Sequence, residues 1–353
     1  MQIADKHSLW NHAAQRGAVT QMKGYKAFFN TMLALWMSLP TLAHAETVVM
    51  AVPGPGNMAF LPVYLTKAIG ADHDEGLTLK LRYFNGGPLA IRDLITHNSD
   101  FVAVSLPAIA AARADGMPVV AFGQLSDSAM FVLLLRANLK NQVTSIAQLN
   151  GRRIGTPAGT STQRTMGQMV AEYLLSRAGL KPNDTLFIPT GLNRESQHAA
   201  LSSGTVDALI GDEPFASELV AEGVAVILAD MYSVAQSKAL LNGSIVRAAL
   251  ATRESVYAQH PSTVKKVQRM LNRTLEWLSK HSSQEIAHKL ASQPGFDAAN
   301  TKQLIAILQR SQGMFPNQLA WNTQAVATTE SFFHRMAANQ AESDLHFADF
   351  IRN

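Results

Sequence analysis

The sequence predicts an α/β protein made of two similar lobes and a helical C-terminal part. Short apolar strand patterns alternate with helix patterns from residue 47 onward, as in parallel β-α-β units with helices on both faces. The alternation starts again after residue 138, and from residue 261 the chain is mostly helical in pattern. The length of 353 residues suits about two ordinary domains.

The first lobe opens with "TVVMAV", a short apolar run typical of a buried strand, and the turn-rich loop "PGPGN" follows it. The next helix ends at Gly70, and later helices begin at Pro88 and Pro107, because proline fits the first turn of a helix and glycine the residue after its end. The expected strands are 47–52, 77–84, 100–105 and 118–126, and the expected helices are 60–70, 88–96 and 107–116.

The second lobe repeats this plan. Asp100 and Pro107 stand seven residues apart in the first lobe, and Asp207 and Pro214 repeat that spacing between the same kinds of element. We therefore favour two lobes over the alternative of one continuous sheet. The expected strands are one within 149–160, then 185–189, 206–211 and 224–230, and the expected helices are 161–179, 194–204 and 213–223.

The C-terminal part begins with a stretch over residues 243–261 that is typical of a strand crossing back toward the first lobe. A strongly amphipathic helix follows over 262–281. Its apolar face carries Val264, Val267, Met270, Leu271, Leu275 and Leu278.

The first 45 residues resemble a secretory signal peptide. "MKGYK" is a short positive segment, "AFFNTMLALWMSLPTLA" is apolar, and "AHA" is a small-residue cleavage site that ends at Ala45. A signal that starts at Met22 has normal proportions, so residues 1–21 are interpreted as an over-extended start or an extension. The alternatives are a buried helix or a membrane anchor, but Pro40 and polar residues interrupt an apolar run that is short for a bilayer. We expect cleavage after Ala45 and an exported, soluble protein.

The composition excludes several classes of function. There is no cysteine, which excludes disulfides, thiolate nucleophiles and zinc–thiolate sites. Residues 1–45 hold four basic side chains and one acidic, and without them 26 basic residues face 25 acidic ones. This balance gives no reason to expect nucleic acid or a membrane surface as a partner. His281 and His288 could share a helix face but have no third ligand nearby, so we expect no metal and no other cofactor.

Polar or glycine-rich loops follow the predicted strands, and ligands of parallel sheets bind at the carboxyl ends of strands. The loop "GTPAGTSTQRT" (155–165) has no Gly-Lys-Ser/Thr for a phosphate loop, and Gln163 stands where a nucleophile elbow needs glycine. Ser161 also lacks a placed histidine and acid, so we expect no enzyme activity. The loop can cap its helix or bind an anion there, and the pattern leaves both readings open. Asp212 and Glu213 favour a ligand contact or a helix N-terminal charge over an acid/base pair.

Several stretches together resemble the periplasmic solute-binding proteins of ABC importers, in the group for nitrate, sulfonates, taurine and thiamine-pyrimidine precursors. They cover about residues 47–280, and "PGPGN" departs from the family pattern by its extra proline and glycine. The resemblance implies the two-lobe fold of type II periplasmic binding proteins. Lobe 1 is then 46–130 plus 253–353, and lobe 2 is 131–252 with hinge crossings near 130–138 and 244–252. The stretches are "FLPVYLTKAIG", "EGLTLKLRYFNGGP", "DFVAVSLPAIAAARADGMPVVAF", "SIAQLNGRRIGTPAGTST" and "ALSSGTVDALIGDEPFAS".

The resemblance also implies a function: a monomer that captures a small solute in the cleft, either a sulfonate- or nitrate-type anion or a small heterocycle. It would deliver the solute to a membrane permease with its ATPase. One alternative is a sensor subunit for a membrane kinase. Another is an iron-dependent thiamine-pyrimidine synthase, against which the signal peptide and the lack of cysteine argue. The implied ligand contacts are Asn57, Met58, Phe60, Ser105, Gln124, Ser126, Asp127, Thr160, Ser161, Thr162, Asp212 and Glu213, with Asn193 as a further candidate.

Overall fold

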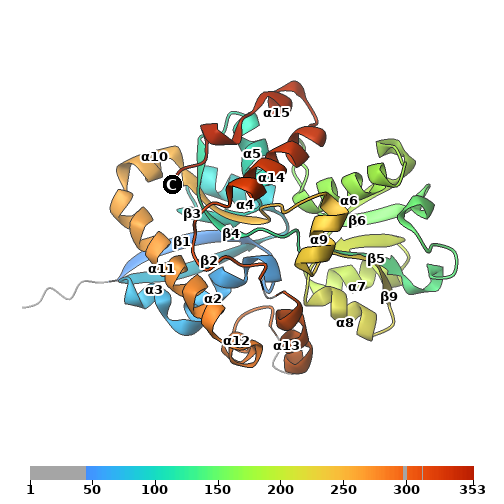
Figure 1. The fold of residues 1–353 in the computed structure, drawn as a ribbon, viewed down its shortest axis with the longest axis horizontal. Helices are drawn as coiled ribbons and strands as arrows, with labels where there is room; N and C mark the ends of the chain where they lie inside the picture. The colour runs from blue at the N-terminus through green and yellow to red at the C-terminus, as the bar shows by residue number, and fades with distance from the viewer. Residues whose placement is uncertain (1–44, 297–299, 312) are drawn as a thin grey trace, which may run out of the picture. The chain divides into compact units, whose positions relative to one another are not determined.

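The structure is a computed structural model that describes residues 45–296, 300–311 and 313–353. In this part of the chain the strands form two separate five-stranded sheets, each accompanied by helices (Figure 1). The alternative of one continuous sheet is therefore wrong. The predicted signal peptide lies outside the described residues, apart from its last residue, Ala45. None of the helices in the described ranges is long and apolar enough to cross a membrane.

The first sheet has the strand order β2-β1-β3-β10-β4. Its first three strands run parallel, as the alternating pattern predicts, whereas β10 runs antiparallel to β3 and β4. All six residues of β10 are buried, because this strand lies inside the sheet with a neighbour on each side. The strands are β1 (Glu46–Pro53), β2 (Leu77–Phe84), β3 (Phe101–Val104), β4 (Val119–Ser126) and β10 (Ala248–Arg253). The helices of this half are α2 (Leu61–Ile69), α3 (Ala71–Asp74), α4 (Gly87–Ile95), α5 (Leu106–Ala114) and α10 (Glu254–Gln259).

The second sheet repeats the plan of the first in the order β7-β6-β8-β5-β9. Its β6 pairs in parallel with β7 and β8, and β5 runs antiparallel between β8 and β9, just as β10 does in the first sheet. The repeated Asp-to-Pro spacing thus belongs to equivalent places in two equivalent sheets. The strands are β5 (Val132–Arg136), β6 (Arg153–Pro157), β7 (Leu186–Thr190), β8 (Ala208–Gly211) and β9 (Ala225–Asp230). The helices are α6 (Met166–Arg177), α7 (Arg194–Ser202), α8 (Phe215–Ala221) and α9 (Val234–Leu241).

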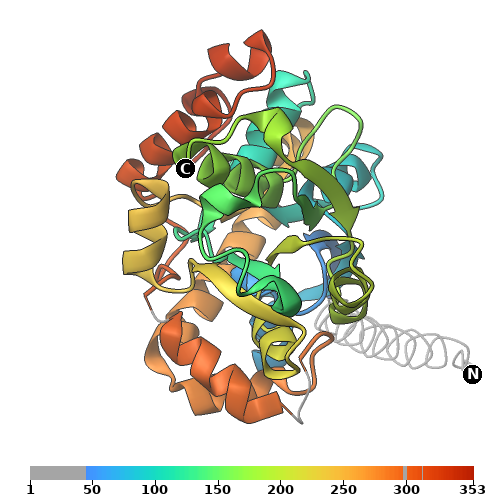
Figure 2. The ribbon, with the colours of Figure 1, turned by 90° about the vertical axis from the view of Figure 1, so that its right-hand side faces the viewer.

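The C-terminal helices contact both halves. The amphipathic helix α11 packs on α2 and α3, and α14 and α15 pack on α5, so this part rests mainly on the first half. Phe332 of α14 reaches the second half, where its ring centre lies 5.4 Å from that of Tyr173. Figures 1 and 2 both show α12 and α13 at one end of the molecule and α14 and α15 at the other. These helices are α11 (Pro261–Lys280), α12 (Ser283–Leu290), α13 (Thr301–Arg310), α14 (Thr323–Arg335) and α15 (Gln340–Asp344).

Candidate functional site

A small cavity lies between the halves built on the two sheets. Loops that follow strands of both sheets line it, together with Phe131 and Arg247 from the two connections between the sheets. The free volume at its centre is about 20 Å³, which is room for one water molecule. Three of the predicted ligand contacts line this cavity: Asn57, Ser105 and Asp212.

Three helices begin at the cavity. Ser105 caps α5, where its Oγ accepts a hydrogen bond from the Ala108 N–H at 3.3 Å, and Thr165 caps α6 in the same way. The third helix, α4, begins after Gly86. The first N–H groups of a helix have no acceptor within the helix and carry a partial positive charge. The cavity is therefore well suited to an anionic group.

Arg247 and Asp212 form a buried ion pair in the cavity wall. The Nη2 of Arg247 donates to Oδ1 of Asp212 at 3.0 Å, and the two side chains are 7% and 4% exposed. The guanidinium carbon lies 4.0 Å from the ring centre of Phe131 and 5.6 Å from that of Phe60, so aromatic rings hold it in place. Among the described residues, neither Nε of Arg247 nor Oδ2 of Asp212 has a hydrogen-bond partner. The pair thus keeps one donor and one acceptor unused.

Burial changes the protonation of the carboxyl groups near the cavity. It raises the pKa of Asp212, and the charge and hydrogen bond of Arg247, with the side chain of Asn57, oppose part of that rise. Burial also raises the pKa of Glu213, against the hydrogen bonds of Ser217 and the charge of Arg310. Both acids therefore hold a proton more readily than an exposed carboxyl group does.

The loop before Asn57 is rich in proline and glycine because it passes very close to another loop. Gly56 has φ +77°, and a Cβ placed there would lie 2.4 Å from the carbonyl oxygen of Gly295. Tyr64 Oη donates to the carbonyl oxygen of Gly54 at 2.7 Å, and this hydrogen bond holds the loop against α2. Asn57 then caps the short 3₁₀ helix Met58–Phe60, and its Oδ1 accepts from the N–H two residues on at 3.0 Å. The departure from the family pattern thus has a packing cause.

Met58, Phe60 and Glu213 lie beside the cavity and do not line it. The N–H of Met58 donates to the carbonyl oxygen of Glu213 at 3.2 Å, which joins the two halves. The carboxylate of Glu213 faces away, toward Arg310 of α13 at 2.6 Å. The structure therefore places these three residues in the support of the cavity.

Gln124, Ser126 and Asp127 are covered by the C-terminal part of the chain. Oε1 of Gln124 accepts from the N–H of Asn322 at 3.0 Å, and the carboxylate of Asp127 accepts from the side chain of the same asparagine at 3.3 Å. Ser126 is buried at the end of β4, and Oγ of this serine has no hydrogen-bond partner within the described residues. These three residues thus do not line the cavity, although Phe131, later in the connection after β4, does.

Thr160, Ser161 and Thr162 lie outside the cavity as well. The expected helix over 161–179 begins only at Met166, so these three residues do not form its N-terminus. Thr160 Oγ1 accepts from the N–H of Gln163, and Thr162 donates to Asp115 of the first half at 3.2 Å. The hydroxyl at the helix N-terminus belongs to Thr165, a residue of the same loop that was not among the implied ligand contacts. Thr165 therefore caps α6, whereas Thr160, Ser161 and Thr162, which were expected to be able to cap it, do not.

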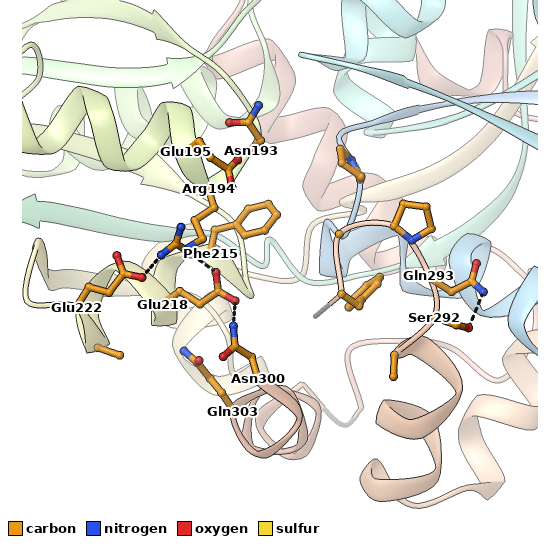
Figure 3. A pocket seen from close by; sticks show the side chains of 16 residues that line it. Asn193, Arg194, Glu195, Phe215, Glu218, Glu222, Ser292, Gln293, Asn300 and Gln303 are labelled. Atoms are coloured by element: carbon orange, nitrogen blue, oxygen red, sulfur yellow. Dashed lines mark hydrogen bonds and ion pairs between the residues drawn. The ribbon is translucent and has the colours of Figure 1, made fainter. Parts of the chain in front are cut away.

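Asn193 caps α7 and lines a larger neighbouring pocket of about 990 Å³ (Figure 3). This pocket lies between α7 and α8 on one side and the loop after α12 on the other. Figure 3 shows Arg194 between Glu218 and Glu222, and Glu218 also accepts from Asn300 at 2.9 Å. Because acids surround Arg194, it offers no free positive charge to an anion.

Sequence reasoning missed Arg247, Thr165 and the glycine turn before α4. Arg247 is the only charged residue in the apolar run 244–251, and that isolation is the signal that could have identified it. The described residues contain no group of three or more His, Cys, Asp or Glu side chains placed to hold a metal ion.

Comparison with known proteins agrees with this architecture. The structure is similar to a protein of Bordetella bronchiseptica RB50, with a TM-score of 0.79, 22% identity, and coverage of 87% of this chain and 95% of that one. It is similar to the alkanesulfonate-binding protein SsuA of Xanthomonas axonopodis pv. citri bound to MOPS, with a TM-score of 0.65, 18% identity, and coverage of 87% and 98%. It is also similar to the periplasmic nitrate-binding protein NrtA of Synechocystis PCC 6803, with a TM-score of 0.64, 13% identity, and coverage of 87% and 86%.

Sequence similarity identifies a relative and a family. The protein YtlA of Bacillus subtilis (strain 168) is 22% identical over 233 residues, which cover 64% of this chain and 65%, less than two thirds, of that relative. The family model described as NMT1/THI5 like matches residues 57–285, well over half of the chain. The predicted fold is thus confirmed as that of periplasmic binding proteins, and the chain belongs to the NMT1/THI5-like family.

Proposed function

We propose that this protein is the solute-binding component of an ABC importer and captures a small solute in the cavity between its halves. The observation that carries the proposal is the convergence of three helix N-termini and a buried arginine on one cavity of a two-lobe fold. Such a cavity suits a sulfonate- or nitrate-type anion, or a small heterocycle with an anionic group. Similar structures include an alkanesulfonate-binding protein and a nitrate-binding protein, which supports a solute of this class.

The proposal includes a place and partners for the protein. It is exported by the signal peptide, cleaved after Ala45, and works as a monomer in the periplasm. A permease in the inner membrane receives the solute, and an ATPase on the far side supplies the energy. The chain itself performs no catalysis.

Capture depends on opening and closing of the two halves. We take 46–130 with 253–353 as one moving body and 131–252 as the other. Residues 248–252 move with the first body, because β10 pairs with β3 and β4 there. The N–H of Ala158 donates to the carbonyl oxygen of Asn85 at 3.2 Å, so the halves are in contact around the cavity. A solute enters when they part, and it favours closure by binding the closed arrangement more tightly than the open one.

A thermal-shift screen of the protein 46–353 tests this function. The compounds are nitrate, taurine, alkyl- and arylsulfonates, aromatic carboxylates and pyrimidine precursors. A ligand at 100 times its dissociation constant should add about 2.7 kcal/mol to the free energy of unfolding. No shift with any of these compounds on well-folded protein would contradict the proposal.

Two matched serine variants then locate the site. Ser105→Ala and Ser282→Ala each remove a serine that caps a helix, and in both the Oγ–N distance is 3.3 Å. Each should lower the free energy of unfolding by about 1 kcal/mol. Only Ser105→Ala should also weaken the affinity for the compound found in the screen, because Ser105 lines the cavity and Ser282 caps α12.

A further inference from the structure

The carboxylate of the buried pair in the cavity wall differs from that of the Asp207 pair, whereas Nε of Arg247 and Nε of Arg136 both lack an acceptor among the described residues. Asp207 pairs with Arg136 at 2.9 Å through Oδ1, and its Oδ2 accepts from the N–H of Arg153 at 3.0 Å, so both oxygens are used. At the cavity, Asp212 uses only Oδ1, and its Oδ2 has no hydrogen-bond partner in the part of the chain that the structure describes. A buried carboxylate oxygen without a partner destabilises the folded state. A purely structural pair would be expected to resemble the pairs of Asp207.

The partner of Asp212 is incomplete in the complementary way. Nε of Arg247 is a donor without an acceptor among the described residues, and the stacking on Phe131 holds the guanidinium so that it cannot turn freely. Both side chains line the cavity, so a molecule bound there can reach them, and the Asn57 side chain acts on Asp212 from the same wall. The two unused atoms are one donor for an anion and one acceptor for an N–H group.

A simple oxyanion satisfies only part of this arrangement. It can accept from the helix N-terminal N–H groups and from Arg247, but it leaves Oδ2 of Asp212 unpaired and adds a second negative group beside it. A ligand that carries an N–H donor a few atoms from its anionic group satisfies both unused atoms. Specificity for hydrogen-bonding groups is strong when the site is left with unpaired buried atoms by the wrong ligand.

We infer that Asp212 and Arg247 together form a two-point recognition site, which selects ligands with an anionic group and a nearby N–H donor over simple anions of the same length. This inference rests on the proposed function and narrows it. The helix N-termini and Arg247 receive the anionic group, and Asp212 receives the N–H group. Asp212 is then the residue that excludes inorganic and simple organic anions.

Isothermal titration with three matched pairs of probes tests the inference at pH 7. The pairs are β-alanine and propanoate, taurine and ethanesulfonate, and 2-aminoethylphosphonate and ethylphosphonate. In the pair with the better-fitting acid group, the amino compound should bind at least tenfold more tightly than its partner. In Asp212→Asn this preference should fall to about twofold or less. In the control Glu276→Gln it should persist, because that carboxylate pairs with Lys280 on the exposed face of α11, away from the cavity.

Each outcome decides the question. Equal or tighter binding of the simple anions in every pair overturns the inference and leaves the proposed function intact. Absence of binding by all six probes at 10 mM, roughly the upper limit of a millimolar-affinity measurement, overturns the inference, whereas the proposed function is overturned only if the wider thermal-shift screen also finds no ligand. A preference that is unchanged in folded Asp212→Asn also overturns the inference, because Asp212 would then not be the residue that recognises the N–H group. If Asp212→Asn does not fold, the comparison of the six probes on the unchanged protein decides alone.

Discussion

Replacing Arg247 by methionine should destabilise the ligand-free protein by about 3–5 kcal/mol, because it leaves the buried Asp212 carboxylate without its counter-charge. The Nη2–Oδ1 distance is 3.0 Å, so at an effective dielectric constant of 20 the lost attraction is about 5 kcal/mol. Loss of the contact with the ring of Phe131 adds about 1 kcal/mol, and the flexible methionine side chain regains part of the packing. The double variant Arg247→Met with Asp212→Asn removes both charges and should regain at least half of the loss.

Urea unfolding of the protein 46–353, followed by tryptophan fluorescence at pH 7 and pH 5, measures these differences. Burial already raises the pKa of Asp212, and without Arg247 it lies still further above the value in the unfolded chain. The folded state then holds this proton more tightly than the unfolded state does. The free energy of unfolding of Arg247→Met should therefore increase as the pH falls from 7 to 5. A loss below about 1 kcal/mol, or a double variant as unstable as the sum of the two single ones, would refute the reasoning that this is a coupled buried pair.

Three further predictions concern glycines and the N-terminus. Gly56→Ala should lower the free energy of unfolding in urea by about 2–4 kcal/mol, because φ is left-handed and the new Cβ would lie 2.4 Å from the carbonyl oxygen of Gly295. Gly70→Ala has a similar φ of +76° but open space around it, so it should lower that free energy by about 1 kcal/mol. Equal losses in the two variants would contradict the close crossing of the two loops. Gly86→Ala places a Cβ 2.0 Å from the carbonyl oxygen of Ala158, so it should block closure and weaken solute affinity at least tenfold, roughly 1.4 kcal/mol, with no such effect in Gly70→Ala. Mass spectrometry of protein from a periplasmic fraction should find an N-terminus at or within a few residues of Glu46; an intact N-terminus in the cytoplasm would exclude export.

The elements of the fold could be predicted because each one is coded locally. The run 77–84 alternates and is closed by glycine turns, and β2 has the same bounds. The long amphipathic helix was expected at 262–281 and lies at Pro261–Lys280, since its apolar stripe and its first-turn proline are strong signals. The start of α6 was placed five residues too early. Thr160 and Ser161 resemble helix caps in sequence, but Thr165 makes the capping hydrogen bond.

The site was only partly predictable because it joins residues that are distant in the chain. Asn57, Ser105 and Asp212 lie in loops that follow strands, and the family resemblance implied them as ligand contacts. Gln124 lies near the carboxyl end of β4, yet Asn322 covers it, and nothing in the local pattern indicates where the C-terminal segment returns. Arg247 lies within an apolar crossing segment, where a local pattern gives no indication of a binding role.

The place of β10 in the first sheet has a consequence for the order in which the chain can assemble. All strands of the second sheet come from one continuous stretch, 132–230, so it can form through short loop closures. The first sheet is complete only when residues 248–253 insert between β3 and β4. A chain that ends before residue 248 therefore keeps every strand of the second sheet but leaves β3 and β4 with unpaired backbone edges. Such edges favour pairing with other chains, so truncated forms should be far more prone to aggregation than the whole protein.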